Sequence, residues 1–224
     1  MLTLAFDTTT STLSVALLAG QKILVNNTIF ESEKQSELLI PEIEKALHSQ
    51  KIWYQDLDLI ATTNGPGSFT GTRIGITAAR TIKTAINAPL ILVNSCEVFA
   101  FKHREYSGKI FVVLDATNNE LFFAEFLAQN EEIMQITEPR LISYDELLQI
   151  LPKEDFLLCG SGKKIVKDLW IKQQTWHNRN EDNDILESCL IGLLALKKFQ
   201  HSKSSKNLDP LYLRAPRISE RKKR

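Results

Sequence analysis

A strand–turn–strand unit occurs twice in this sequence, and the repeat constrains the fold more than any other feature. The first copy spans residues 4–16 and the second spans residues 112–124. In each copy an apolar strand ends in an aspartate, Asp7 or Asp115, and a polar turn and a second strand follow. The repeat predicts two related lobes that face a shared cleft, an architecture that usually handles a nucleotide. A chance likeness between two β-hairpins is the alternative.

Composition allows one large domain or two small ones, since 43% of the 224 residues are hydrophobic. The 27 basic and 27 acidic residues cancel, so no global field attracts nucleic acid. The charge is uneven near the C-terminus, where Glu220 is the only acid among six basic residues: Arg214, Arg217, Arg221, Lys222, Lys223 and Arg224. This stretch is either a solvated tail or a tail that contacts the phosphates of an RNA.

Cysteine usage and hydropathy favour a cytoplasmic protein with no membrane association. Cys96, Cys159 and Cys189 are odd in number and widely spaced, which predicts buried thiols in a reducing compartment. No apolar run is long enough to span a bilayer, and Met1 leads directly into a predicted strand without a secretion signal.

The hydrophobic periodicity predicts an α/β protein with an N-terminal lobe at 1–104 and a smaller C-terminal lobe at 105–224, which ends in the basic tail 214–224. In the first lobe we expect strands at 2–6, 13–18, 23–30, 57–63 and 90–93, and helices at 36–49, 73–87 and 96–103. In the second lobe we expect strands at 110–114, 121–127, 133–137 and 156–159, and helices at 143–151, 163–172 and 185–199.

The first two predicted helices carry apolar faces that are wider than a sheet needs. The residues of these faces are Leu38, Leu39, Ile43 and Leu47 on the first helix, and Gly75, Ala78, Ala79 and Ile82 on the second. Small side chains on the second helix would let another helix approach closely. The two faces therefore either cover the sheet or bind another subunit.

Three polar or glycine-rich turns are candidate phosphate-binding sites. The first contains Asp7, Thr8 and Thr9, whose donors could hold a phosphate while Asp7 reaches Mg²⁺ through water. The second contains Gly65 and Gly67 between a strand and a helix, and the third contains Gly160 and Gly162. A simple structural turn is the alternative in each case, and it is the favoured one for the third; neither glycine loop has the spacing of a Walker A loop.

The sequence gives no support for a metal hydrolase or a serine nucleophile. His48, His103, His177 and His201 are scattered, with no metal-binding spacing among them. No Gly-x-Ser-x-Gly elbow is present either. We therefore predict no catalytic residue and no metal ligand.

Three segments together resemble the TsaB family, also called YeaZ: Phe-Asp-Thr-Thr-Thr at 6–10, Asn-Gly-Pro-Gly-Ser-Phe-Thr-Gly-Thr-Arg-Ile-Gly at 64–75 and Pro-Leu-Tyr-Leu-Arg at 210–214. The resemblance covers essentially the whole chain. It implies an actin-like ATPase (ASKHA) fold with two RNase H-like lobes, the second reduced. It also implies a role in making N6-threonylcarbamoyladenosine at position 37 of tRNAs that read ANN codons.

The resemblance further implies that this chain does not transfer the threonylcarbamoyl group. The relative TsaD does so with a metal on a His-x₃-His pair, whereas the corresponding segment here, 93–99, has no histidine. Implied partners are TsaD, or a second copy when the chain is alone, through the first two helices. The ATPase TsaE docks at the TsaB–TsaD junction, and tRNA is reached through the complex. No cofactor is required, although ATP or ADP at the subunit interface stays open.

The sequence departs from the family pattern at two places. The turn 116–120 has neither the basic residue nor the glycines of a second phosphate loop, which weakens any claim of ATP hydrolysis. Gln35 stands where the family has histidine, which puts little in doubt. The rival functions are a small-molecule kinase of the same fold and a metallopeptidase.

Overall fold

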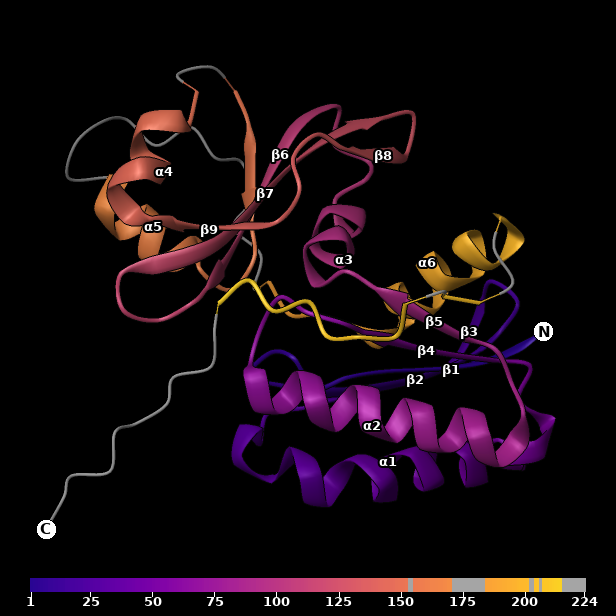
Figure 1. The fold of residues 1–224 in the computed structure, drawn as a ribbon. Helices are drawn as coiled ribbons and strands as arrows, with labels where there is room; N and C mark the ends of the chain where they lie inside the picture. Colours follow the sequence, from indigo (N-terminus) through magenta and orange to yellow (C-terminus); the bar gives the residue numbers. More distant parts are fainter. Residues whose placement is uncertain (153–154, 171–183, 202–203, 206, 215–224) are drawn as a thin grey trace, which may run out of the picture.

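The computed structural model describes residues 1–152, 155–170, 184–201, 204–205 and 207–214. Two five-stranded sheets lie side by side, with helices on both faces of the first (Figure 1). The two sheets lie on either side of the predicted boundary at 104/105. None of the described helices has the length and apolar character needed to cross a bilayer.

The first sheet has the strand order β3-β2-β1-β4-β5. Its strands are β1 (Leu2–Asp7), β2 (Leu13–Ala19), β3 (Lys22–Ile29), β4 (Leu59–Thr63) and β5 (Leu90–Val93). The first three strands form an antiparallel meander, and β4 and β5 run parallel to β1. Apart from Leu2 and Ala19, every residue of β1, β2, β4 and β5 is buried, as expected for strands covered on both faces.

Helices α1 (Gln35–Ser49) and α2 (Phe69–Ile86) cover one face of this sheet (Figure 1). Helix α2 begins four residues before the predicted start, because the side chain of Ser68 caps it by accepting a hydrogen bond from the Gly71 backbone N at 3.1 Å. The helix ends at Asn87, which adopts the left-handed conformation at φ 54°.

The second sheet repeats the hairpin of the first. Its order is β10-β6-β7-β8, with β9 also paired to β7. The strands are β6 (Gly108–Asp115), β7 (Glu120–Gln129), β8 (Glu132–Gln135), β9 (Arg140–Ser143) and β10 (Leu157–Cys159). Asp7 pairs with Ser14 whereas Asp115 pairs with Leu121, so the second turn is one residue shorter. The repeat is thus present in the structure.

Several smaller elements differ from the sequence prediction. Strand β9 was not predicted. Helix α4 (Tyr144–Ile150) starts one residue after the predicted start because the side chain of Ser143 caps it by accepting from the Glu146 backbone N at 3.1 Å; the Glu146 carboxylate pairs with Arg140. Helix α5 spans Lys163–Trp170, and the predicted helical residues 171–172 lie outside the described residues, as do His177 and the tail from 215 onward.

Helix α6 (Ser188–His201) is placed differently from the prediction. Chain order assigned it to the C-terminal lobe, but it packs on the first sheet, on the face opposite α1 and α2 (Figure 1). A Cβ atom at Gly192 would lie 2.4 Å from a methyl carbon of Leu18, so the glycine lets α6 approach β2 closely. The helix starts at residue 188 and not at the predicted residue 185. At its first residue, the Ser188 backbone N donates to the hydroxyl of Ser14 at 2.9 Å.

Helix α3 (Ser95–Lys102) lies between the two sheets and joins their cores (Figure 1). One apolar cluster contains residues from both sheets together with α3 and α6. The three cysteines are buried without disulfides, as predicted, and burial raises the pKa of Cys189 to about 11. The lobes are therefore continuous at α3 and separate on the other side, where the cleft opens.

Candidate functional site: the interlobe cleft and the outer helix face

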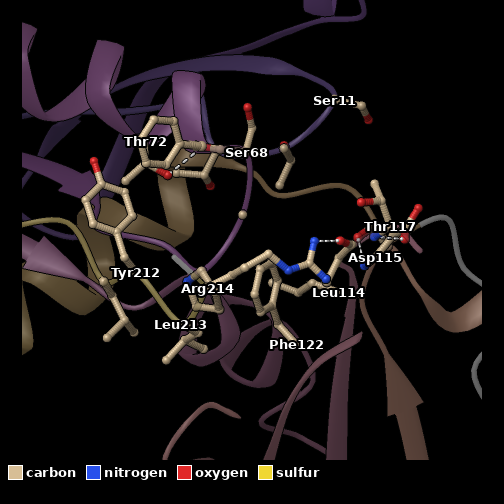
Figure 2. A pocket seen from close by; sticks show the side chains of 18 of the residues that line it. Ser11, Ser68, Thr72, Leu114, Asp115, Thr117, Phe122, Tyr212, Leu213 and Arg214 are labelled. Atoms are coloured by element: carbon tan, nitrogen blue, oxygen red, sulfur yellow. Dashed lines mark hydrogen bonds between the residues drawn. The ribbon is translucent and has the colours of Figure 1, made fainter. Parts of the chain in front are cut away.

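A cleft of about 890 Å³ lies between the two lobes (Figure 2). The first lobe lines it with hydroxyl groups and the start of α2, and the second lobe lines it with the turn after β6. The lining residues are Thr9, Thr10, Ser11, Gln35, Pro66, Gly67, Ser68, Phe69, Thr72, Leu114, Asp115, Ala116, Thr117, Phe122, Ser161, Leu211, Tyr212, Leu213 and Arg214. Of the seven predicted phosphate-site residues, Thr9 and Gly67 line the cleft.

Asp7 is fully buried at the end of β1 and does not line the cleft. One carboxylate oxygen accepts from the hydroxyls of Thr9, at 2.6 Å, and Thr63. The other accepts from the Thr9 backbone N at 3.1 Å and the Thr10 hydroxyl at 3.3 Å. An ionised carboxylate offers about four lone-pair positions, so these donors use its acceptor capacity. Burial raises the pKa of Asp7, and the hydrogen bonds only partly offset this.

The turn after Asp7 is tied to the rest of the first lobe. The hydroxyl of Thr8 donates to the Gly71 carbonyl at 2.7 Å, and the hydroxyls of Thr9 and Ser95 lie 3.2 Å apart. Thr8 and Thr9 are both buried. These hydroxyls therefore hold strand ends and helix starts together, which is the structural alternative that the sequence left open.

The predicted glycine loop packs against this same turn. A Cβ atom on Gly67 would lie 2.4 Å from the Thr9 carbonyl oxygen. Gly65 has a positive φ of 99°, and a Cβ there would lie 3.2 Å from the Leu211 carbonyl oxygen. The glycines of this candidate phosphate loop do allow close approach, but the atoms that approach belong to the protein itself.

The glycines of the third candidate turn, Gly160 and Gly162, also pack against atoms of the protein itself, here in the second lobe. A Cβ atom on Gly160 would lie 2.3 Å from the Val113 carbonyl oxygen, and one on Gly162 would lie 2.7 Å from a methyl carbon of Leu121. The Gly162 backbone N also donates to the Val113 carbonyl at 3.0 Å. Neither glycine lines the cleft.

Arg214 lines the cleft and was not among the predicted site residues. Its guanidinium donates from Nη1 to the Ala116 carbonyl at 2.6 Å and forms an ion pair through Nη2 with Glu120. Figure 2 shows it extending towards Asp115 and Thr117. Its place in the segment 210–214 was the only signal in the sequence.

The predicted interface residues lie mostly beneath the surface. Six of them are buried in the monomer, namely Leu39, Ile43, Leu47, Gly75, Ala79 and Ile82. Leu38 and Ala78 are half-buried. Burial of these six supports the alternative that the apolar stripes cover the sheet, and the use of the two faces as an interface stays a prediction.

An apolar groove nevertheless lies on the outer side of the two helices. Its volume is about 490 Å³, and it is lined by Ser36, Leu39, Ile40, Arg73, Ile74, Thr77, Ala78, Thr81 and Ile82. Ile40 is 41% exposed, and Ile74 is half-buried. These two isoleucines were outside the predicted set, although they belong to the same wide apolar stripes.

The segment 93–99 runs from the end of β5 into α3, and its polar side chains already have partners within the protein: Ser95 lies 3.2 Å from the Thr9 hydroxyl, and Glu97 pairs with Lys198 at 2.6 Å. The side chain of Asn94 caps the helix by accepting from the Cys96 backbone N at 2.8 Å. Within the described ranges, no three His, Cys, Asp or Glu side chains gather as metal ligands would.

Comparison with known proteins identifies the family of the chain. The family model of TsaD, tRNA N6-adenosine threonylcarbamoyltransferase, matches residues 29–186. The tRNA threonylcarbamoyladenosine biosynthesis protein TsaB of Bacillus subtilis is 28% identical over 75% of each chain, and that of Haemophilus influenzae is 24% identical over 94% of this chain and 92% of its own. The chain belongs to the TsaB/YeaZ family.

The solved structures support the same family at the level of fold. YeaZ from Pseudomonas aeruginosa superposes with a TM-score of 0.79 at 21% identity, covering 95% of this chain and 99% of its own. The predicted actin-like fold is confirmed.

Proposed function

We propose that this TsaB-family chain is a non-catalytic subunit for threonylcarbamoyl transfer to adenosine 37 of ANN-decoding tRNAs, and that it acts by pairing with TsaD. The names of its relatives, tRNA threonylcarbamoyladenosine biosynthesis proteins, support the pathway. The observation that carries the proposal is a contrast: the outer helix groove is apolar and open, whereas the Asp7 carboxylate is buried beneath the turn and does not reach the cleft.

The groove between α1 and α2 supports pairing with a helical partner. Ile40 and Ile74 supply apolar surface that the monomer leaves partly in water. Ala78 is small enough to let a partner helix approach closely. Thr77, Thr81 and Arg73 add polar groups to the lining of the groove. An apolar centre with polar groups around it suits an amphipathic helix laid into a groove.

The chemistry of the cleft supports a non-catalytic role. Asp7 already accepts hydrogen bonds from four donors of its own lobe, which leaves a divalent cation no vacant oxygen. The segment 93–99 lacks the imidazoles that a TsaD-type metal would use. The turn 116–120 presents an acidic side chain, Glu120, and no basic one.

The same proposal covers the remaining partners. In the absence of TsaD, a second copy of this chain would occupy the α1–α2 groove, since the surface is the same. TsaE would dock at the junction with TsaD, and tRNA would be contacted through the complex. The chain requires no cofactor of its own, and ATP or ADP would be held only where two subunits meet.

Reconstitution of tRNA modification tests the proposal. TsaD and the other components are supplied with wild-type chain, without it, with Ile40→Glu and with Ile150→Glu. Ile150 is a matched control because it is 39% exposed, close to the 41% of Ile40, but lies on α4 in the other lobe. Modification should need the chain, fall with Ile40→Glu and persist with Ile150→Glu. Full modification without the chain would refute the proposal.

A small-molecule kinase is the alternative, and the size of the cleft favours it. A cleft of about 890 Å³ between two actin-like lobes has room for a nucleotide. Purified chain that hydrolyses ATP or phosphorylates a small acceptor by itself would favour the kinase over the subunit. We expect no turnover above a buffer control, because the described residues of neither lobe combine an available metal-binding carboxylate with a glycine-lined phosphate loop.

A further inference from the structure

The last described segment of the chain, residues 207–214, crosses the mouth of the interlobe cleft. We call it the C-terminal strap. Figure 1 shows it in yellow, running from the first lobe towards the second. Three of the cleft-lining side chains at its end are Tyr212, Leu213 and Arg214 (Figure 2). Helix α3 joins the cores of the two lobes, and the strap is a further connection between them on the side of the cleft.

The strap is anchored firmly to the first lobe. The Leu211 backbone N donates to the Asn64 carbonyl at 2.7 Å. Arg80 donates to the Leu208 carbonyl at 2.6 Å and pairs with Asp209 at 3.1 Å. These contacts fix the backbone of the strap along the end of β4 and along α2.

A second anchor is a stack of aromatic rings and a guanidinium. The rings of Phe69 and Tyr212 lie 4.9 Å apart, and the Arg73 guanidinium lies 4.0 Å from the centre of the Phe69 ring. The Nε of Arg73 also donates to the Tyr212 hydroxyl at 2.8 Å. The chain two residues before Arg214 is thereby held on the first lobe.

Arg214 itself contacts the second lobe. Two different nitrogens of its guanidinium meet two acceptors of one turn, the Ala116 carbonyl and the Glu120 carboxylate. The turn is shaped by three successive residues with positive φ, Thr117, Asn118 and Asn119 at 62°, 56° and 60°. A planar guanidinium fits such a pair of acceptors better than a single ammonium does. Arg214 is 24% exposed and Glu120 is 37% exposed, so the pair is partly shielded from water.

We propose that the turn 115–120 is a guanidinium-binding site, that Arg214 of the same chain occupies it, and that this contact is a latch that sets the opening of the interlobe cleft. In the repeated strand–turn–strand unit, this turn is the counterpart of the turn that follows Asp7 in the first lobe. It offers a cation a carbonyl and a carboxylate, whereas a phosphate would need donors. The strap therefore occupies the wall where a second phosphate loop would stand, and a ligand that enters there must displace Arg214.

Hydrogen exchange in the full-length chain tests whether the site exists. The variants are Arg214→Ala, Arg214→Lys and, as a matched control, Arg80→Ala, which removes a strap contact within the first lobe only. We expect amide exchange of residues 116–121 to rise about tenfold or more in Arg214→Ala, in line with the loss of a charge-assisted pair. Arg80→Ala should leave that turn unchanged. An unchanged turn in Arg214→Ala would overturn the site.

Chemical rescue tests the guanidinium assignment. Millimolar N-ethylguanidine should restore slow exchange of the turn in Arg214→Ala, and ethylamine should not. Equal restoration by both, or by neither, would overturn the assignment. If Arg214→Ala proves unfolded by circular dichroism, the same comparison is made on Arg214→Lys, which should leave the turn exchanging faster than in the wild-type chain.

Measuring the distance between the two lobes tests whether the Arg214 contact acts as a latch. Spin labels at exposed positions 70, on α2, and 145, on α4, report the separation of the lobes. The distance distribution should broaden in Arg214→Ala and not in Arg80→Ala. A turn that exchanges faster with no change in lobe separation would overturn the latch. These outcomes are independent of pairing at the α1–α2 groove.

Discussion

Gly71, in the first turn of α2, lies directly against the backbone of Thr8, in the turn after β1. A Cβ atom at position 71 would lie 1.8 Å from the Thr8 carbonyl oxygen, and the Thr8 hydroxyl donates to the Gly71 carbonyl at 2.7 Å. Two segments that are far apart in sequence thus touch backbone to backbone. This contact packs the first turn of α2 against the turn after β1, and the neighbouring residues Thr9 and Thr72 line the cleft.

Gly71→Ala should therefore destabilise the chain by about 3 kcal/mol or more, because the carbonyl that meets the new methyl group is backbone and cannot turn aside. Gly20→Ala is the control. Gly20 has a positive φ of 58° but open space around it, so only backbone strain of about 1 kcal/mol is expected there. Urea denaturation of both variants measures the difference. Equal losses would mean that the Thr8 contact is not tight.

Asp7→Asn should lower the free energy of unfolding by about 2 kcal/mol, although it removes a buried charge. An amide has one acceptor oxygen, and its NH₂ group would face the Thr9 backbone N–H or the hydroxyls that now donate to the carboxylate. The control is Asp145→Asn, an exposed carboxylate on α4, with an expected change below about 1 kcal/mol. A variant as stable as the wild type would show that the hydroxyl network does not depend on the carboxylate.

The fold was predictable from the sequence where the signal is local. An apolar strand that ends in aspartate, followed by a polar turn, identified both hairpins, and the register of Asp7 and Asp115 follows from those turns. The place of α6 was not predictable, because an almost wholly apolar helix fits either sheet equally well. What places it on the first sheet is the fit of Gly192 against Leu18, a contact between residues far apart in sequence.

The sequence indicated which residues make close contacts at the site, but it did not indicate which atoms they contact. The glycines at 67 and 160 are both places of close approach, and the atoms that approach are the carbonyls of Thr9 and Val113. Helical periodicity likewise found the apolar stripes of α1 and α2. It could not distinguish Leu39, which faces the sheet, from Ile40, which faces solvent, because the two are adjacent on one wide stripe.

Asp184 gives the chain a dependence of stability on acid pH. Its carboxylate, 3% exposed, accepts from Lys163 Nζ and the Gly160 backbone N, both at 2.9 Å, and lies 3.4 Å from His103 Nε2. Burial alone would raise the pKa of Asp184, but the His103 and Lys163 contacts outweigh it and lower the pKa below 3.8. The stabilisation is therefore present above pH 3.8 and lost as pH falls through the lower folded-state value.

Asp184→Asn should cost about 3 kcal/mol at neutral pH, because it removes one partner from a buried charged group. The cost should shrink as the pH falls from the unfolded-state pKa to the lower folded-state pKa, because below the folded-state value the wild-type carboxyl is neutral as well. Urea denaturation of both proteins at steps from pH 7 to acid measures this difference. A cost that stays constant over the whole range would show that the lowered pKa does not contribute to stability.

At the α1–α2 groove we expect opposite effects from substituting two adjacent residues, Leu39 and Ile40. Leu39 is 1% exposed, so Leu39→Glu places a charge in the core and should destabilise the monomer by about 4 kcal/mol or more. Ile40→Glu should change monomer stability by less than about 1 kcal/mol. It should nevertheless weaken pairing about tenfold or more, since a charge would enter a desolvated contact.

Size-exclusion chromatography over a concentration series, alone and with TsaD, measures pairing, and thermal unfolding measures the fold. Ile150→Glu on α4 should behave as the wild type in both measurements. If Ile40→Glu pairs as tightly as Ile150→Glu, then the groove is not the contact surface, whatever Leu39→Glu does. A folded Leu39→Glu monomer that fails to pair would instead mean that α1 exposes its inner stripe when the partner binds.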